Sequence, residues 1–141
     1  MSLIAQTIKN YQVDIVVNGH NILADEPESH GGDNQGPNPY DLLLASLAAC
    51  KVITVHMYAE RKGWPVEKVI LNLSHHKIDA ADCDDCESES GKVDEFLCEI
   101  SFEGDLDEEQ HKRLAQIADR CPIHRTLSSE NKIRTTLKST H

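Results

Sequence analysis

The chain has 141 residues, of which 27% are charged, and its formal net charge is −10. This length is typical of one domain, and it suffices to bury a core without disulfide bonds. The negative charge argues against a nucleic-acid-binding protein and against binding to an anionic membrane surface, because both need clustered Lys and Arg. We therefore expect a single domain over residues 1–141, with neither nucleic acid nor membrane as a partner.

The expected compartment is the cytoplasm. The first residues, MSLIAQTIKNYQVD, contain no basic stretch followed by an apolar one, so no signal peptide is predicted. The longest apolar run, Leu42 to Cys50, is far shorter than the ~20 residues of a membrane span. Five cysteines without a secretory signal indicate a reducing compartment, in which thiols stay free unless they do chemistry.

The first predicted elements form a β-hairpin. Apolar residues alternate with polar ones between residues 13 and 17, and Asn18-Gly19 is a strong signal for a two-residue hairpin turn. The return strand contains Ile22 and Leu23. Residues 27–39, PESHGGDNQGPNP, are rich in Gly and Pro and show no periodicity, which predicts a loop.

A long helix is predicted from Pro39 to Lys62. Asn38 is suited to the N-cap and Pro39 to the first helical position, and Gly63 follows the last turn. The first half is apolar all round, a pattern typical of a helix that is buried on every side. In a small domain this indicates a central helix that is wrapped by sheet or by a second subunit.

The second half of the chain predicts strands and another helix. Val66–Asp79 and Val93–Glu103 are strand-like, and Cys98 lies on the apolar face of the later strand, where we expect it in the core. Asp107 begins a helix with Gln110 in the capping-box position, and the segment KIRTTL is expected to form a last strand. The fold class is α+β, with helices packed against a largely antiparallel sheet.

Cys50 and Cys121 lie in different local surroundings. Cys50 is inside the long helix, where a cysteine is most simply a small buried hydrophobe. Cys121 precedes Pro122, which places it at the N-cap of a short helical turn, where unpaired N–H groups and the helix dipole stabilise a thiolate. Arg120, His124 and Arg125 add to this effect, so the segment favours a lowered thiol pKa, although an ordinary capped turn explains it as well.

Cys83 and Cys86 form a CxxC motif in an acidic linker. The surrounding carboxylates raise thiol pKa values, which disfavours a redox role. A zinc site needs two further ligands, and only one of His75 and His76 is available because adjacent strand residues point to opposite faces. A solvated acidic loop is therefore favoured, with zinc binding as the alternative.

Two motifs carry a family resemblance. GPNPYDLLLASLAAC (Gly36 to Cys50) and DRCPIHRTL (Asp119 to Leu127) resemble the two-cysteine signature of the OsmC/Ohr family of thiol-dependent hydroperoxide peroxidases. The resemblance implies that Cys50 is the peroxidatic thiol and Cys121 the resolving thiol. It also implies an intertwined homodimer with antiparallel sheets around central helices, an external dithiol reductant, and no bound cofactor or metal.

The resemblance also indicates supporting residues, with departures from the family pattern. The family places a glutamate ten residues before the peroxidatic cysteine, where this chain has Tyr40, followed by Asp41. The family also has an arginine in the N-terminal strand region, whereas the first arginine here is Arg61. We therefore name Tyr40, Asp41, Arg61 and Arg125 as candidate supporting or substrate-binding residues.

The expected function is reduction of organic hydroperoxides in antioxidant defence. The residues that flank Cys50 on its helix are mostly apolar, so a hydroperoxide with an apolar tail fits better than hydrogen peroxide. Two alternatives remain: a non-catalytic lipid-binding or small-ligand-binding module of the same fold, and a zinc protein that uses Cys83 and Cys86.

Overall fold

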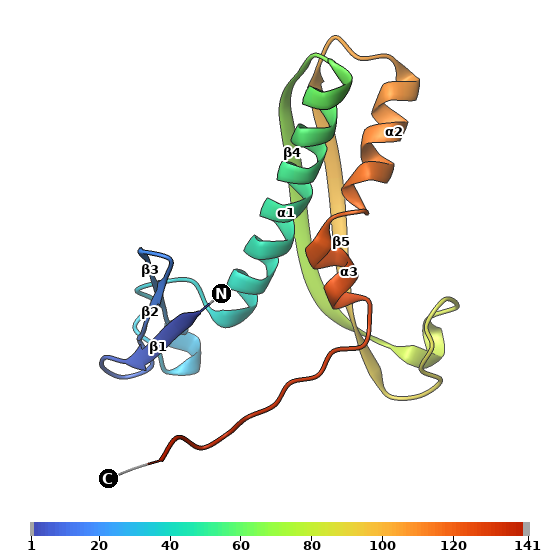
Figure 1. Cartoon of the computed structure of the whole chain (residues 1–141). Coiled ribbons are helices and arrows are strands. Elements are labelled where there is room, and N and C mark those ends of the chain that lie inside the picture. Colours follow the sequence, from blue (N-terminus) through green and yellow to red (C-terminus); the bar gives the residue numbers. More distant parts are fainter. Residues whose placement is uncertain (1, 140–141) are drawn as a thin grey trace. The chain divides into compact units, whose positions relative to one another are not determined.

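The structure is a computed structural model that describes residues 2–139, and its chain divides into two compact units (Figure 1). The boundary between the units follows Ser46, inside helix α1 (Pro39–Lys62). We describe each unit by itself.

The first unit contains a three-stranded antiparallel sheet. Its strands are β1 (Leu3–Thr7), β2 (Val13–Val17) and β3 (His20–Ala24), in the order β1-β2-β3. The turn between β2 and β3 has Asn18 at φ 48° and Gly19 at φ 79°, and a two-residue hairpin turn needs this left-handed backbone. The predicted hairpin is confirmed. Strand β1 was not predicted, because LIAQT is too short to show a clear alternation.

Asp25 organises the Gly- and Pro-rich loop of this unit. Its buried carboxylate accepts hydrogen bonds from the backbone N–H groups of Glu26 (2.7 Å), Asp33 (3.2 Å) and Gln35 (3.0 Å). Burial acts to raise the pKa of the Asp25 carboxyl, but the three N–H donors together hold this pKa below its ordinary value. The loop includes the short 3-10 helix η1 (Glu28–His30). Its backbone is therefore held by hydrogen bonds to the buried Asp25 carboxylate.

Helix α1 has the predicted bounds and cap. The Asn38 side chain accepts from the Asp41 N–H at 2.8 Å, and the Asp41 carboxylate accepts from the Asn38 N–H at 3.0 Å, which is a reciprocal capping box. The prediction that the first half is buried on every side is wrong for the single chain, because Leu47 is the one buried residue between Pro39 and Cys50. In the second half, Ile53 is 57% exposed and Met57 is 59% exposed. Only one stripe, spaced four residues apart, is buried: Leu47, Lys51, Val55 and Ala59.

Helix α1 also corrects the expectation that no segment is long enough to span a membrane. Among the described residues it is the one helix that passes a test of length and composition, with a mean hydropathy of 1.7 over an 18-residue window. The expectation counted only the uninterrupted apolar run. A core helix of a soluble protein passes the same test, so this is weak evidence for a membrane span.

The second unit is built on a long β-hairpin. Strands β4 (Val66–Asp79) and β5 (Lys92–Gly104) pair antiparallel and confirm the two predicted strands. Helix α2 (Glu108–Ala118) begins at the predicted capping box of Asp107 and Gln110. The core unites α1, β5 and α2, and Figure 1 shows both helices beside the hairpin. Its buried members are Val55, Ala59, Phe102, Leu114, Ile117 and Ala118.

The predicted last strand is absent from the described residues. After helix α3 (Pro122–Leu127), residues 128–139 have no regular secondary structure, and Ile133 and Leu137 are 92% and 93% exposed. A strand needs a neighbour for its N–H and C=O groups, and no described strand pairs with KIRTTL. The predicted last strand is therefore one that the described part of the single chain does not form.

We expect Leu114→Ala to lower the free energy of unfolding by about 3 kcal/mol, because the fully buried side chain leaves a cavity in the core. Glu109→Ala, at an exposed position of the same helix, should change it by less than about 0.5 kcal/mol. Urea denaturation followed by circular dichroism measures both. Equal effects of the two substitutions would contradict this assignment of the core.

Candidate active site

The fold brings the Cys50 and Cys121 thiols together. Cys121 is the N-cap of α3, with Pro122 at the first helical position, and its sulfur accepts from the His124 N–H at 3.2 Å. Cys121 is 0% exposed, whereas Cys50 on α1 is half-buried. The Cys50 thiol is near enough to act on the pKa of Cys121, so the two side chains lie close together. The second unit thus has both cysteines in one region, and their roles as peroxidatic and resolving thiols stay predictions.

The predicted lowering of the Cys121 pKa is wrong. Burial, the largest effect, raises the pKa of this thiol, and the His124 N–H only partly opposes the rise. The neighbouring Cys50 thiol raises the pKa of Cys121 further. The N-cap position was predicted correctly, but its effect on the thiol is smaller than the cost of removing a thiolate from water.

Lys51, which sequence reasoning missed, lies next to this pair. It is 1% exposed, and its ammonium group donates to the Ala118 carbonyl (3.1 Å), the Asp119 carboxylate (3.2 Å) and the His124 Nδ1 (2.8 Å). The available signal was a lysine directly after Cys50 in an otherwise apolar stretch. A buried ammonium is stable only when its donors are paired, and this one has three acceptors.

The four candidate supporting residues make contacts elsewhere. In the first unit, Tyr40 is exposed and Asp41 caps α1. In the second unit, the Arg61 guanidinium lies 5.4 Å from the centre of the Tyr58 ring, and Arg125 donates to the Arg120 carbonyl at 3.3 Å. These contacts of Asp41, Arg61 and Arg125 do not involve a thiol, and the supporting roles of all four residues stay predictions.

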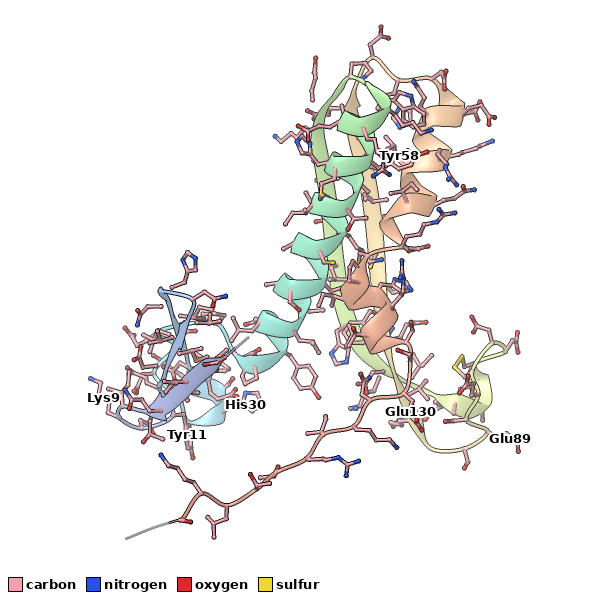
Figure 2. All side chains as sticks on the ribbon, in the orientation of Figure 1. Lys9, Tyr11, His30, Tyr58, Glu89 and Glu130 are labelled. Carbon is pink, nitrogen blue, oxygen red and sulfur yellow. A yellow bond between two sulfur atoms is a disulfide. The ribbon has the colours of Figure 1, made fainter. Side chains whose placement is uncertain are left out.

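A surface hollow of about 230 Å³ lies between α1 and α2, and along α1 it extends from Thr54, one helical turn beyond Cys50, to Arg61. Tyr58, labelled in Figure 2, contributes to it, and the Arg113 Nε donates to the Tyr58 hydroxyl at 3.1 Å. That bond lowers the pKa of the Tyr58 hydroxyl. The lining combines apolar and cationic side chains: Thr54, Met57, Tyr58, Arg61, Ile117 and Arg120.

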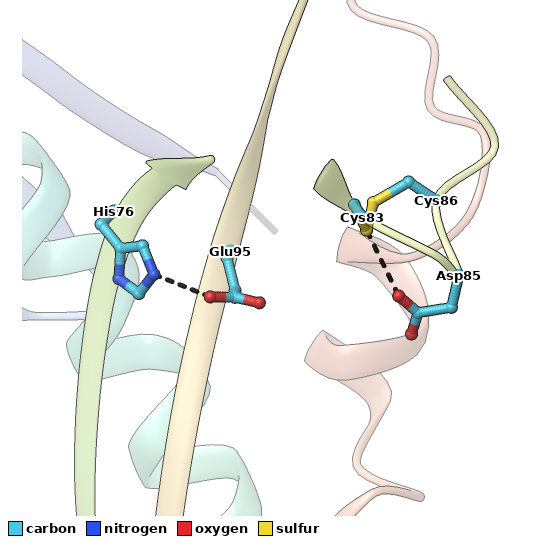
Figure 3. The surroundings of a disulfide bond; sticks show 5 residues. All are labelled: His76, Cys83, Asp85, Cys86 and Glu95. Atoms are coloured by element: carbon cyan, nitrogen blue, oxygen red, sulfur yellow. Dashed lines mark hydrogen bonds and ion pairs between the residues drawn. A yellow bond between two sulfur atoms is a disulfide. The ribbon is translucent and has the colours of Figure 1, made fainter. Parts of the chain in front are cut away.

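Cys83 and Cys86 form a disulfide in the loop between β4 and β5 (Figure 3), which corrects the expectation of free thiols. Their Cα atoms lie 5.5 Å apart, a usual separation for such a bond. The Asp85 carboxylate is 3.2 Å from the Cys83 sulfur. Among the described residues, the one group of possible metal ligands comprises Cys83, Asp85 and Cys86.

The zinc alternative is not supported by this arrangement. A disulfide lacks the thiolate charge with which cysteine binds zinc. Neither predicted histidine joins the group: His75 bonds to Asp94 at 2.8 Å, and His76 bonds to Glu95 at 2.7 Å (Figure 3). Each histidine is thus paired with a carboxylate of β5.

Cys98 is exposed, so its expected place in the core is wrong. The buried end of β5 lies further along the strand, where Phe102 packs against the helices. The alternation of residues along β5 identified its apolar face correctly. The alternation did not show how much of that face the helices cover.

By its fold and its site, this is an α+β protein with two neighbouring thiols, one of which is the N-cap of a helix that begins with Cys-Pro. The family model for OsmC-like proteins matches residues 32–136, well over half of the chain, and the chain belongs to this family. The predicted family and the α+β class with antiparallel sheets are confirmed. No curated protein matches the chain.

Solved structures of the family have the same fold. A Psychrobacter arcticus protein, classed with osmotic stress induced and detoxification response proteins, has a TM-score of 0.71 and 19% identity over 89% of this chain and 87% of its own. An OsmC-like protein from Mycoplasma pneumoniae has a TM-score of 0.69 and 21% identity, over 89% of this chain and 85% of its own. The organic hydroperoxide resistance protein OhrB of Bacillus subtilis has a TM-score of 0.61 and 18% identity, over 90% of this chain and 89% of its own.

We expect iodoacetamide to modify the exposed Cys98 first, Cys50 more slowly, and Cys121 last, because the Cys121 thiol is buried and its pKa is raised. Peptide mass spectrometry after timed alkylation measures the order. In denaturant without reductant, all three should react while Cys83 and Cys86 do not. Native alkylation of Cys121 at the rate of Cys98 would contradict the burial.

Proposed function

We propose that this protein is a thiol-dependent peroxidase that reduces organic hydroperoxides. The observation that carries the proposal is the contact between a half-buried thiol, Cys50, and a fully buried one, Cys121. A peroxide from solvent reaches the half-buried sulfur more readily, which assigns the first attack to Cys50. Family membership and neighbours named as hydroperoxide resistance proteins support this assignment.

In the first step the Cys50 thiolate attacks the distal oxygen of the hydroperoxide. The O–O bond breaks, the alkoxide takes up a proton and leaves as an alcohol, and Cys50 becomes a sulfenic acid.

In the second step the Cys121 thiolate attacks the Cys50 sulfenic acid. A disulfide forms and the hydroxyl group leaves with a proton as water. An external dithiol then reduces the disulfide by two exchange reactions and becomes a disulfide itself. These steps use no bound cofactor, and cytoplasmic dithiols are the proposed reductant.

The proposed substrate carries an apolar organic group. Thr54 and Met57 follow Cys50 along α1 and line the hollow between α1 and α2. An organic tail in this hollow would bury apolar surface, whereas hydrogen peroxide has none to bury. A ligand-binding module without chemistry would use the same hollow, and the thiol experiment below separates the two functions.

We also propose a homodimer in which residues 1–141 form one OsmC-like domain per subunit. Ile53 and Met57 are more than half exposed on α1, and the apolar Ile133 and Leu137 are almost fully exposed in the last segment. Exposed apolar residues on an otherwise core-forming helix are typical of a subunit interface.

We expect a dimer of the 15.7 kDa chain in sedimentation velocity at micromolar concentration. Ile53→Glu should shift the distribution toward monomer, because a carboxylate in the interface is desolvated without a partner. Glu109→Gln, a change at an exposed position of α2, is the matched control and should stay dimeric. A monomeric parent protein would remove the dimer proposal.

The thiol roles are tested with serine substitutions. Cys50→Ser should abolish reduction of cumene hydroperoxide in the presence of a dithiol, because serine is not appreciably ionised at neutral pH. Cys121→Ser should consume one equivalent of peroxide per subunit and stop with a Cys50 sulfenic acid, which dimedone traps.

Cys98→Ser is the control and should turn over like the parent. A sulfenic acid on Cys121 in the Cys50→Ser protein would reverse the two roles. Equal slow peroxide consumption by the parent and both serine variants would remove the peroxidase proposal and favour the ligand-binding module.

A further inference from the structure

The buried Lys51 is not used by the chemistry described above. The residue is 1% exposed, and burial of an unpaired charge costs several kcal/mol, so the contacts of the ammonium group decide whether it is tolerated. The three acceptors supply the needed pairing: a carbonyl at 3.1 Å, a carboxylate at 3.2 Å and an imidazole nitrogen at 2.8 Å.

These acceptors surround Cys121 in the sequence. Ala118 and Asp119 precede it at the end of α2, and His124 follows it in α3. One side chain from α1 thus holds both flanks of the buried cysteine. Because Lys51 directly follows Cys50, the same turn of α1 carries the first thiol and the group that fixes the second.

His124 links this contact to the sulfur. Its Nδ1 accepts from Lys51, since an ammonium group can only donate, so the ring proton lies on Nε2. The backbone N–H of the same residue donates to the Cys121 sulfur at 3.2 Å. A shift of His124 would therefore move a hydrogen bond to the thiol.

We infer that Lys51 is a positioning residue for the thiol pair: it holds Cys121 against Cys50 and supplies the fixed positive charge beside the two sulfurs. The inference rests on the proposed attack of Cys121 on a Cys50 sulfur. The two arginines named as candidates have other contacts, because the Arg61 guanidinium lies over the Tyr58 ring and Arg125 donates to the Arg120 carbonyl.

The electrostatic effect has a defined direction. Lys51 acts to lower the pKa of Cys121 against the opposing effect of burial, and it acts in the same direction on Cys98 of β5. Asp119, which is largely exposed, acts oppositely on Cys98. The groups that act on the Cys121 thiol are Cys50 and Lys51 from α1 and the His124 N–H from α3. Asp119 at the end of α2 contacts Lys51, and Cys98 of β5 is within reach of the charges of both Lys51 and Asp119.

The test follows attack by Cys121 without any peroxide. In a Cys98→Ser background, Cys50 reacts with dithiobis(nitrobenzoate) and forms a mixed disulfide with one thionitrobenzoate released. The Cys121 thiolate then attacks the Cys50 sulfur and releases the second thionitrobenzoate as the internal disulfide forms. The rate of this second release, measured from neutral to alkaline pH, reports on Cys121.

We expect Lys51→Met to slow the second release by about 100-fold, the scale of a small misplacement of reacting groups. Its pH profile should also move to higher pH, because the positive charge is gone. Lys112→Met, at an exposed position of α2, is the matched control and should change neither quantity. An unmoved pH profile in Lys51→Met would overturn the inference, whatever the rate.

Asp119→Asn is a second variant for the same measurement, the pH profile of the second release, in case Lys51→Met does not fold. Asparagine retains an oxygen acceptor for Lys51 and removes the opposing negative charge, so the profile should move to lower pH. No shift, or a shift to higher pH, would overturn the inference. Normal release by a parent protein that fails to turn over hydroperoxide would defeat the peroxidase proposal and leave the role of Lys51 intact.

Discussion

The burial of one ammonium group constrains the thiol region more than any other single interaction. An ammonium in a protein interior must find an acceptor for each donor, and the acceptors of Lys51 lie at the end of α2 and in α3. The apolar stripe of α1 brings the helices together without fixing their relative rotation, because hydrophobic contact is non-directional. The hydrogen bonds of Lys51 supply the direction, and they place Cys121 beside Cys50.

Two effects of opposite sign meet at Cys121. A helix N-cap with a donated N–H favours a thiolate, and full burial favours a thiol. Burial is the larger effect here, so the pKa of Cys121 is raised and the residue keeps its proton in the resting state. In the proposed peroxidase this balance suits a resolving cysteine, because a protonated Cys121 would not compete with Cys50 for peroxide.

Local signals predicted the elements well, since caps and turns are encoded by neighbouring residues. Asn18-Gly19, the Asn38 cap of α1 and the Asp107 cap of α2 are all present as expected. The predictions that were wrong concern features that depend on contacts between residues distant in sequence. The raised pKa of Cys121, the exposure of Cys98 and the unpaired KIRTTL segment follow from what covers each residue, which no local pattern contains.

The difference between local signals and distant contacts also explains why the sequence did not indicate a role for Lys51. A lysine in an apolar helix is usually taken as the solvent-facing position, and here it lies in the buried stripe between Leu47 and Val55. Its three acceptors become visible only when α2 and α3 are in place. A positive charge beside the thiols does not require an arginine from the N-terminal strands, because a residue adjacent to Cys50 provides one. The departure from the family pattern in the N-terminal region is therefore compatible with thiol chemistry at Cys50.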